Sequence, residues 1–310
     1  ACGVTTFQDN NVRGVDNVQA YIDVDQQGGM LIRGAIHYTL EWPADLDRAL
    51  EGSLVFHTAV SFVTNTNLQH YAGEVSLSYF SQLVALMWLQ FVSAATGIAA
   101  LAALARGLAG QASMGNFFMD LQRATFLVLL PLAFTVAILM ALGGVPMTLD
   151  GAAEATTLEG VRQVIARGPV AAFVAIKQLG TNGGGFFGPN AAHPFENPTF
   201  WTNALGMVAI LLIPMASVWM FGRVVGNLRH ARVVFGAMLL LLVLKLVGAA
   251  WFEGAPTEAL ADLPVAQDAG NLEGKELRFG AAGGSLWPVL TTSTSNGSVN
   301  AMHDSLNPMT

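Results

Sequence analysis

The sequence predicts an all-α membrane protein in which short segments enter the bilayer between transmembrane helices. Of its 310 residues, 53% are hydrophobic and only 11% are charged, whereas a soluble domain carries about 25% charged residues. Four apolar stretches are long enough to cross a bilayer, which takes about 20 helical residues. Three further apolar stretches are too short to cross, and each leads into polar or glycine-rich sequence.

The four long apolar stretches are the predicted transmembrane helices. They comprise residues 81–105, 124–145, 200–221 and 233–252, and only the last contains a charge, Lys245. Prolines lie inside two of them, which membrane helices tolerate when neighbouring groups bond the freed carbonyls.

The segments between the spans differ in charge, which predicts their orientation. Residues 222–232 carry Arg223, Arg229 and Arg232 without an acid, so the positive-inside rule places them in the cytoplasm. Residues 253–278 carry six acids and two bases and are expected outside. Because consecutive spans alternate in direction, residues 146–167 are expected outside as well.

The three short stretches share one layout. Residues 168–179 would form roughly 18 Å of helix, which is typical of a re-entrant segment. They lead into GTNGGGFFGPNAAHPFENPT. Residues 54–74 and 284–305 likewise begin apolar and continue with Thr, Ser, Asn and Gly. The layout predicts one helix–pore loop–helix unit used repeatedly. The repeats are 117 and 114 residues apart, counted between Thr66, Gly183 and Gly297.

The polar segments have the composition of an ion-selectivity filter. A cation that enters a membrane loses its water oxygens, and backbone carbonyls replace them in potassium channels. Glycine lets carbonyls turn toward one axis without a Cβ clash, and Thr and Ser add hydroxyl oxygens. The absence of acids from these segments favours a large monovalent ion over a divalent one. The predicted ligands are Thr64, Asn65, Thr66, Asn67, Thr181, Asn182, Gly183, Gly184, Gly185, Thr294, Ser295, Asn296, Gly297 and Ser298.

The polar segments and the residues near them have three interpretations other than an ion filter. The glycines alone would also suit a packed turn between helices. A phosphate-binding loop needs Lys and then Ser or Thr after the glycines, but Phe186 follows Gly185. A membrane-embedded hydrolase would use Ser305 and His303, although neighbours in sequence rarely form a catalytic triad.

Lys245 and the polar residues after the middle filter segment have two interpretations each. Lys245 either snorkels toward the membrane surface or faces an ion pathway or a partner. The polar residues after the middle filter segment either attract cations or fix the loop by hydrogen bonds; they are His193, Glu196 and Asn197.

Net charge and cysteine content exclude further classes. The net charge of −7 argues against a nucleic-acid partner. The single cysteine, Cys2, excludes an intrachain disulfide framework and a multi-cysteine metal site. The chain begins with Ala1 and shows no apolar signal segment, so we expect a fragment.

Four segments resemble a known family: TAVSFVTNTN, GTNGGGFFGPNAAHPFENPT, NLEGKELRFG and TTSTSNGSVNAMHDS. They are similar to the potassium-binding (A) subunit of the bacterial Kdp potassium-transporting ATPase, and the resemblance runs from Leu54 to the C-terminus. It implies four pore-loop repeats of the potassium-channel-like superfamily around a filter for the transported potassium ion.

The resemblance also implies partners and a location. The partners would be a P-type ATPase subunit (KdpB-like), which hydrolyses ATP, and small accessory Kdp subunits. The chain itself would be non-catalytic and would lie in the bacterial inner membrane, with its filter loops outside. The alternative is a stand-alone cation channel or symporter of the same pore-loop superfamily.

The chain departs from the family pattern at both ends. Residues 51–106, 107–228 and 229–310 are assigned to the first, second and third repeats, and the fourth is missing. Residues 1–50 form an atypical N-terminal segment, in which residues 18–42 alternate apolar and polar positions like β-strands. This suggests foreign sequence, a truncated gene or a divergent start. Since three of four filter walls leave polar backbone facing lipid, we expect the isolated chain not to transport potassium.

Overall fold

The computed structural model describes residues 51–264 and 266–310. The strand-like N-terminal segment and Cys2 lie outside the described residues. Within them, four helices are long and apolar enough to cross a membrane, which confirms the predicted helical membrane protein. They are Ser81–Leu108, Phe117–Leu142, Phe200–Val224 and Leu228–Glu253.

The first two spans each contain a π-helical stretch. The first joins η2 (Ser81–Met87) to α4 (Trp88–Leu108), and the second joins α5 (Phe117–Arg123), η3 (Ala124–Leu129) and α6 (Leu130–Leu142). Pro131, at the start of α6, has no N–H to donate, so the regular hydrogen-bond ladder is interrupted where η3 meets α6. The other two spans are the uninterrupted helices α8 (Phe200–Val224) and α9 (Leu228–Glu253).

Three shorter helices precede the polar segments, as predicted. They are α2 (Gly52–Val63), α7 (Val170–Leu179) and α10 (Gly280–Thr294). α2 packs on α4, α7 packs on α6 and α8, and α10 packs on α8 and α9. In α7 every residue except Ala172 is buried, so this helix is the centre of the described fold.

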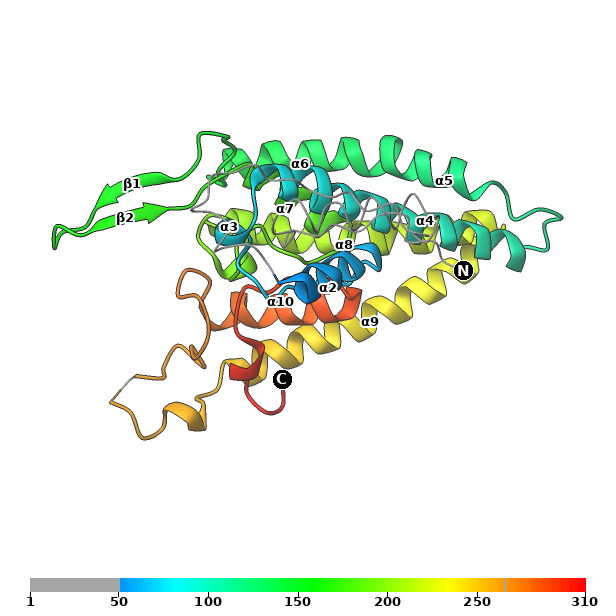
Figure 1. The fold of residues 1–310 in the computed structure, drawn as a ribbon. Helices are drawn as coiled ribbons and strands as arrows, with labels where there is room; N and C mark the ends of the chain where they lie inside the picture. The colour runs from blue at the N-terminus through cyan, green and yellow to red at the C-terminus, as the bar shows by residue number, and fades with distance from the viewer. Residues whose placement is uncertain (1–50, 265) are drawn as a thin grey trace.

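The connecting segments separate to opposite ends of the bundle. Figure 1 shows the hairpin of β1 (Ala153–Thr156) and β2 (Arg162–Ile165) projecting at the same end as the acidic segment after α9. The α4–α5 loop and the α8–α9 turn lie at the other end. This separation follows the alternation expected from the charges. The sequence did not predict the antiparallel hairpin, in which Ala153 pairs with Ile165. Short turns complete the described fold: α3 (Gly73–Ser76), η4 (Asn190–Ala192), η5 (Glu258–Leu260) and η6 (His303–Ser305).

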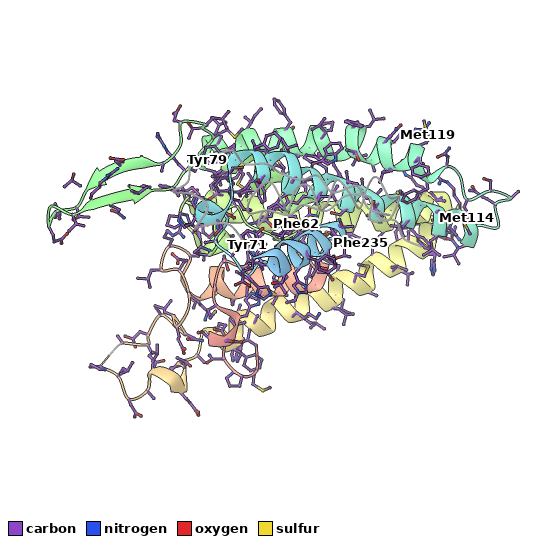
Figure 2. All side chains as sticks on the ribbon, in the orientation of Figure 1. Phe62, Tyr71, Tyr79, Met114, Met119 and Phe235 are labelled. Atoms are coloured by element: carbon purple, nitrogen blue, oxygen red, sulfur yellow. The ribbon has the colours of Figure 1, made fainter. Side chains whose placement is uncertain are left out.

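Two buried apolar clusters hold the short helices against the spans. The larger contains Phe62, Phe173 and Phe186, all fully buried. The smaller contains Trp287 of α10 and Ile210 of α8. Figure 2 shows Phe62 near the middle of the bundle. The spans expose many large apolar side chains, among them Phe126, Leu127 and Leu244. Such exposed side chains suit a hydrocarbon environment.

We predict that the contact of α10 with α8 depends on the missing side chain of Gly206. A Cβ atom at this glycine would lie 2.7 Å from Cη2 of Trp287, whose indole is held by a 3.0 Å hydrogen bond to the carbonyl of Ser298. Gly206→Ala is expected to lower the free energy of unfolding by about 1–3 kcal/mol through overpacking, measured by thermal unfolding of the purified protein.

The matched control is Gly236→Ala on α9, where an added Cβ meets no atom of the described residues within 4 Å. Alanine favours helix over glycine by about 1 kcal/mol, so this variant is expected to keep or gain stability. Equal melting temperatures for the two variants would contradict the packing assigned to Gly206.

Candidate functional site

The three polar segments share one backbone conformation. Each has two residues with left-handed φ angles, separated by one residue with ordinary φ: Asn65 and Asn67, Thr181 and Gly183, Ser295 and Gly297. This pattern corrects the alignment made from sequence. Asn67, not Thr66, is the counterpart of Gly183 and Gly297, because its φ of 53° matches theirs in sign. The sequence hides this, since asparagine stands where the other two loops have glycine.

The carbonyl oxygens of two loops face the third loop at one point. A Cβ atom placed on Gly297 would lie 3.6 Å from the carbonyl oxygen of Thr66 and 3.8 Å from that of Asn182. Three segments far apart in the sequence therefore bring their backbones together here. Among the residues that the structure describes, no donor bonds to the carbonyl oxygens of Thr66, Asn182 or Asn296.

The triple glycine is explained by close approach on several sides. At Gly183 a Cβ atom would lie 2.0 Å from the carbonyl oxygen of Asn296. At Gly184 it would lie 2.8 Å from the ring of Phe62, and at Gly185 it would lie 2.8 Å from Oε1 of Glu196. Distances under 3.0 Å leave no room for a side chain. The glycines thus let the middle loop fit between its neighbours.

The carbonyls of the three glycines are already bonded to side-chain amides. Asn190 Nδ2 donates to the carbonyl of Gly183 at 2.6 Å, and Gln90 Nε2 donates to that of Gly184 at 3.2 Å. Gln69 donates to the carbonyl of Gly185 at 3.0 Å and accepts from its N–H at 2.7 Å. Sequence analysis missed all three amides. The available signal was a glutamine inside an apolar span, Gln90.

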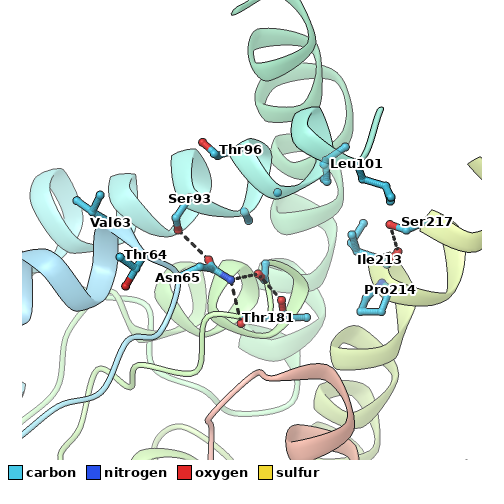
Figure 3. Close-up of a pocket in the computed structure, with 14 residues that line it drawn as sticks. Val63, Thr64, Asn65, Ser93, Thr96, Leu101, Thr181, Ile213, Pro214 and Ser217 are labelled. Atoms are coloured by element: carbon cyan, nitrogen blue, oxygen red, sulfur yellow. Dashed lines mark hydrogen bonds between the residues drawn. The ribbon is translucent and has the colours of Figure 1, made fainter. Parts of the chain in front are cut away.

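Two asparagines join the first and third loops to the C-terminal end of α7. Asn65 Nδ2 donates to the carbonyls of Gly180 at 3.3 Å and Thr181 at 3.2 Å, as Figure 3 shows. Asn296 Nδ2 donates to the carbonyls of Lys177 at 3.3 Å and Gln178 at 3.4 Å. The last carbonyls of a helix have no partner within the helix. The chain after α7 supplies backbone donors here, from Asn182 to Lys177 at 3.0 Å and from Thr181 to Gln178 at 3.2 Å, and the asparagines of the two neighbouring loops add further bonds.

The hydroxyls among the predicted ligands mostly bond elsewhere. Thr64 donates to the carbonyl of Val60 at 2.9 Å, and Thr294 donates to that of Leu290 at 2.9 Å, so both close the last turn of their helices. Thr294 is itself helical. Ser298 donates to Oε1 of Gln178 at 3.0 Å. A hydroxyl that donates its hydrogen keeps its lone pairs, so these bonds orient the hydroxyl oxygens without excluding them as ligands.

A cavity of about 540 Å³ adjoins the first two loops. Thr64, Asn65 and Thr181 line its polar side, and residues of α4 and α8, among them Ile98 and Pro214, line the rest (Figure 3). In the described part of the chain, no group of three His, Cys, Asp or Glu residues could hold a metal ion. The residues that line the cavity in the described part of the chain include no charged side chain, so a ligand there would meet dipoles.

The polar residues after the middle loop fix that loop. Glu196 is buried, pairs with Lys177 and accepts the N–H of Phe187 at 2.8 Å. Asn197 donates to Asn203 at 2.9 Å. The ring of His193 stacks on Phe187 at 3.8 Å, and burial lowers the pKa of this histidine. Their contacts favour the structural interpretation over attraction of cations.

The remaining polar candidates are Ser305, His303 and Lys245. Ser305 donates to Glu273 at 3.3 Å, and in the described residues no hydrogen bond joins it to His303. A serine–histidine pair for hydrolysis is thus not formed. Lys245 is exposed on α9 and has no ion pair within the described chain, which leaves both of its interpretations open.

We predict that the amide of Asn65 stabilises the site through its donor atoms. Asn65→Asp puts a carboxylate against the carbonyls of Gly180 and Thr181, at the negative end of the α7 dipole. The variant is expected to lose about 2 kcal/mol of unfolding free energy, measured as a lower melting temperature. Asn227→Asp is the control, because within the described residues the Asn227 side chain accepts one bond, from the N–H of His230, and donates none. Aspartate can accept that bond equally well. Equal losses in the two variants would contradict this role.

Comparison with known proteins identifies the family. The family profile described as "Potassium-transporting ATPase A subunit" matches residues 34–310. The match begins at residue 34, inside the atypical N-terminal segment of residues 1–50. Three curated relatives, each called "Potassium-transporting ATPase potassium-binding subunit", agree with it. The Pseudomonas aeruginosa protein is 55% identical over 84% of this chain, and the Pseudomonas entomophila protein is 54% identical over 84%. The Rhodospirillum centenum protein is 53% identical over 83%.

The chain spans a little under half of the length of these relatives, 46%, 46% and 45% respectively. The family profile matches most of the chain, and the sequence identities are above 50%. Proteins that share only a fold have much lower identities. The loops quoted for the resemblance lie inside the matched region. The chain therefore belongs to the family of potassium-transporting ATPase A subunits.

Proposed function

We propose that the chain supplies the potassium-selective part of an ATP-driven potassium uptake complex, in which a partner subunit hydrolyses ATP. One observation carries the proposal most directly. The backbone carbonyls of Thr66 and Asn182 face Gly297 at distances of 3.6 and 3.8 Å from its Cβ position, and no described donor bonds to them. Buried or crowded carbonyls normally find donors. Carbonyls without donors at the meeting point of three loops are suited to replace the water around a cation.

The electrostatics of the short helices support the same function. α2 ends directly before its loop, α10 ends at the first residue of its loop, and one residue separates α7 from its loop, so all three C-termini lie next to the loops. A helix C-terminus carries partial negative charge. The predicted ligands include no acid. Dipoles of this strength favour a weakly hydrated monovalent ion such as potassium over a divalent ion.

The names of the relatives give the ion and the kind of complex. They describe potassium-binding subunits of a potassium-transporting ATPase. By extension, we assign the chain to a bacterial inner membrane, with the hairpin end and the filter loops outside. Residues 51–106, 107–228 and 229–310 would supply three repeats of the filter. Small accessory subunits, together with a partner resembling the Kdp ATPase subunit, would complete the complex.

We predict that Gly183→Asp weakens the response to potassium. The experiment completes the chain with the C-terminal half of the Pseudomonas aeruginosa relative and co-expresses the other subunits of that complex; we refer to this assembly as the completed transporter. Its ATP hydrolysis is titrated with potassium, rubidium and sodium. The unsubstituted assembly is expected to respond to potassium at the lowest concentration. In the variant, a side chain that would start 2.0 Å from the carbonyl of Asn296 is expected to raise the half-stimulating concentration at least about tenfold.

The control is Gly160→Asp in the hairpin. Gly160 also has a positive φ, 82°, but in the described part of the chain no atom lies within 4 Å of an added Cβ there. This variant is expected to keep the potassium response of the unsubstituted assembly. An unchanged ion preference in Gly183→Asp would count against a filter at the glycine loop. Selective potassium flux without ATP would instead favour a stand-alone channel.

A further inference from the structure

Lys177 is a buried charge for which the proposed filter gives no role. It lies in the last turn of α7, its side chain is fully buried, and it pairs with Glu196, whose side chain is also fully buried. Burying an ion pair costs desolvation free energy that mutual attraction often fails to recover. A pair of apolar residues would stabilise the helix as well or better. The presence of the Lys177–Glu196 ion pair beside the glycine loop points to a role other than stability.

The ammonium of Lys177 contacts the amide that holds a filter carbonyl. Lys177 Nζ donates to Oδ1 of Asn190 at 2.5 Å, and Nδ2 of the same amide donates to the carbonyl of Gly183 at 2.6 Å. The backbone N–H of Ala191 also donates to Oδ1 at 2.8 Å. Because an ammonium group only donates, the oxygen of Asn190 must face it. The nitrogen must then face Gly183.

The orientation of this amide decides where one carbonyl points. Gly183 and Gly184 lie on either side of the peptide whose oxygen Asn190 holds, and glycines oppose rotation of a peptide very little. If the amide were reversed, its oxygen would face the carbonyl of Gly183 and repel it. The peptide between Gly183 and Gly184 could then turn and bring its carbonyl toward the ion. The preceding carbonyl, that of Asn182, already faces the third loop and has no described donor. Ion preference in such filters depends on how many carbonyls reach the ion.

We propose that Lys177 is a positioning residue for ion selection: paired with Glu196, it fixes the amide of Asn190 so that the Gly183 carbonyl stays bonded and out of the ion's coordination shell. This inference rests on the proposed function, since it concerns the preference of the same filter. Glu196 has a second part in it, because its other oxygen accepts the N–H of Phe187 at 2.8 Å and so fixes the chain after the glycines.

Two variants of the completed transporter test the proposal. Lys177→Met with Glu196→Gln removes the donor to Asn190 without leaving an unpaired buried charge. Asn190→Asp keeps an acceptor for Lys177 but removes the donor to Gly183, and aspartate tolerates the left-handed φ of 59° at this position. Both are expected to reduce the ratio of half-stimulating concentrations, sodium over potassium, at least about fivefold. The maximal potassium-stimulated rate is expected to change little.

The chain provides a matched control in a second buried pair. Lys275 and Glu253 also have fully buried side chains and bond at 2.6 Å, but Glu253 binds the N–H of Asn307 at 2.6 Å rather than a residue of the loops. Lys275→Met with Glu253→Gln removes the same charges and is expected to leave the concentration ratio unchanged.

The outcomes separate the two proposals. If the unsubstituted transporter responds selectively to potassium and both test variants keep its ion preference, only the role of Lys177 is overturned. If only thermal stability falls in the test variants, the pair is structural and the proposal fails. If the control double variant loses selectivity as strongly as the test variants, a role specific to Lys177 is likewise overturned. A transporter that does not respond to potassium overturns the proposed function together with this inference.

Discussion

Hydrogen bonds from side-chain amides to the backbone carbonyls around the C-terminal end of α7 organise the described site. α7 is buried along almost its whole length, and the chain that follows it bonds the carbonyls of Lys177 and Gln178 through backbone N–H groups. Asn65 from the first loop and Asn296 from the third add donors to this group of carbonyls. The end of one short helix is thereby joined to two loops that lie more than a hundred residues away in the sequence.

Amide side chains suit this task because they both donate and accept. Asn65 donates to the end of α7 and accepts from the hydroxyl of Ser93 at 2.8 Å and from Asn182. Gln69 bonds both the N–H and the carbonyl of Gly185. Each amide thus links a loop to a helix or to another loop. In a region with little water, such links set positions more firmly than single bonds from hydroxyls.

The loops contain backbone carbonyls of two kinds, those that accept a hydrogen bond from a side-chain amide and those without a described donor. Amides hold those of Gly183, Gly184 and Gly185, whereas no described donor bonds to those of Thr66 and Asn182. The sequence suggests that the glycine carbonyls are the ion ligands, but in the structure these carbonyls are bonded to amides. They allow backbones to approach within distances that no side chain permits. The free oxygens come largely from residues that have side chains.

The sequence determined the membrane fold, because the length and polarity of a stretch decide whether it can cross a bilayer. It also located the three loops, since runs such as Thr181–Gly185 break apolar helices. It could not give the register of the first loop, because only the backbone angles show that Asn67 matches Gly183. Nor could it show which carbonyls are held and which are free. Their donors, such as Gln90 and Asn190, belong to distant segments or later turns, and only tertiary packing brings a donor within hydrogen-bond distance of one carbonyl rather than its neighbour.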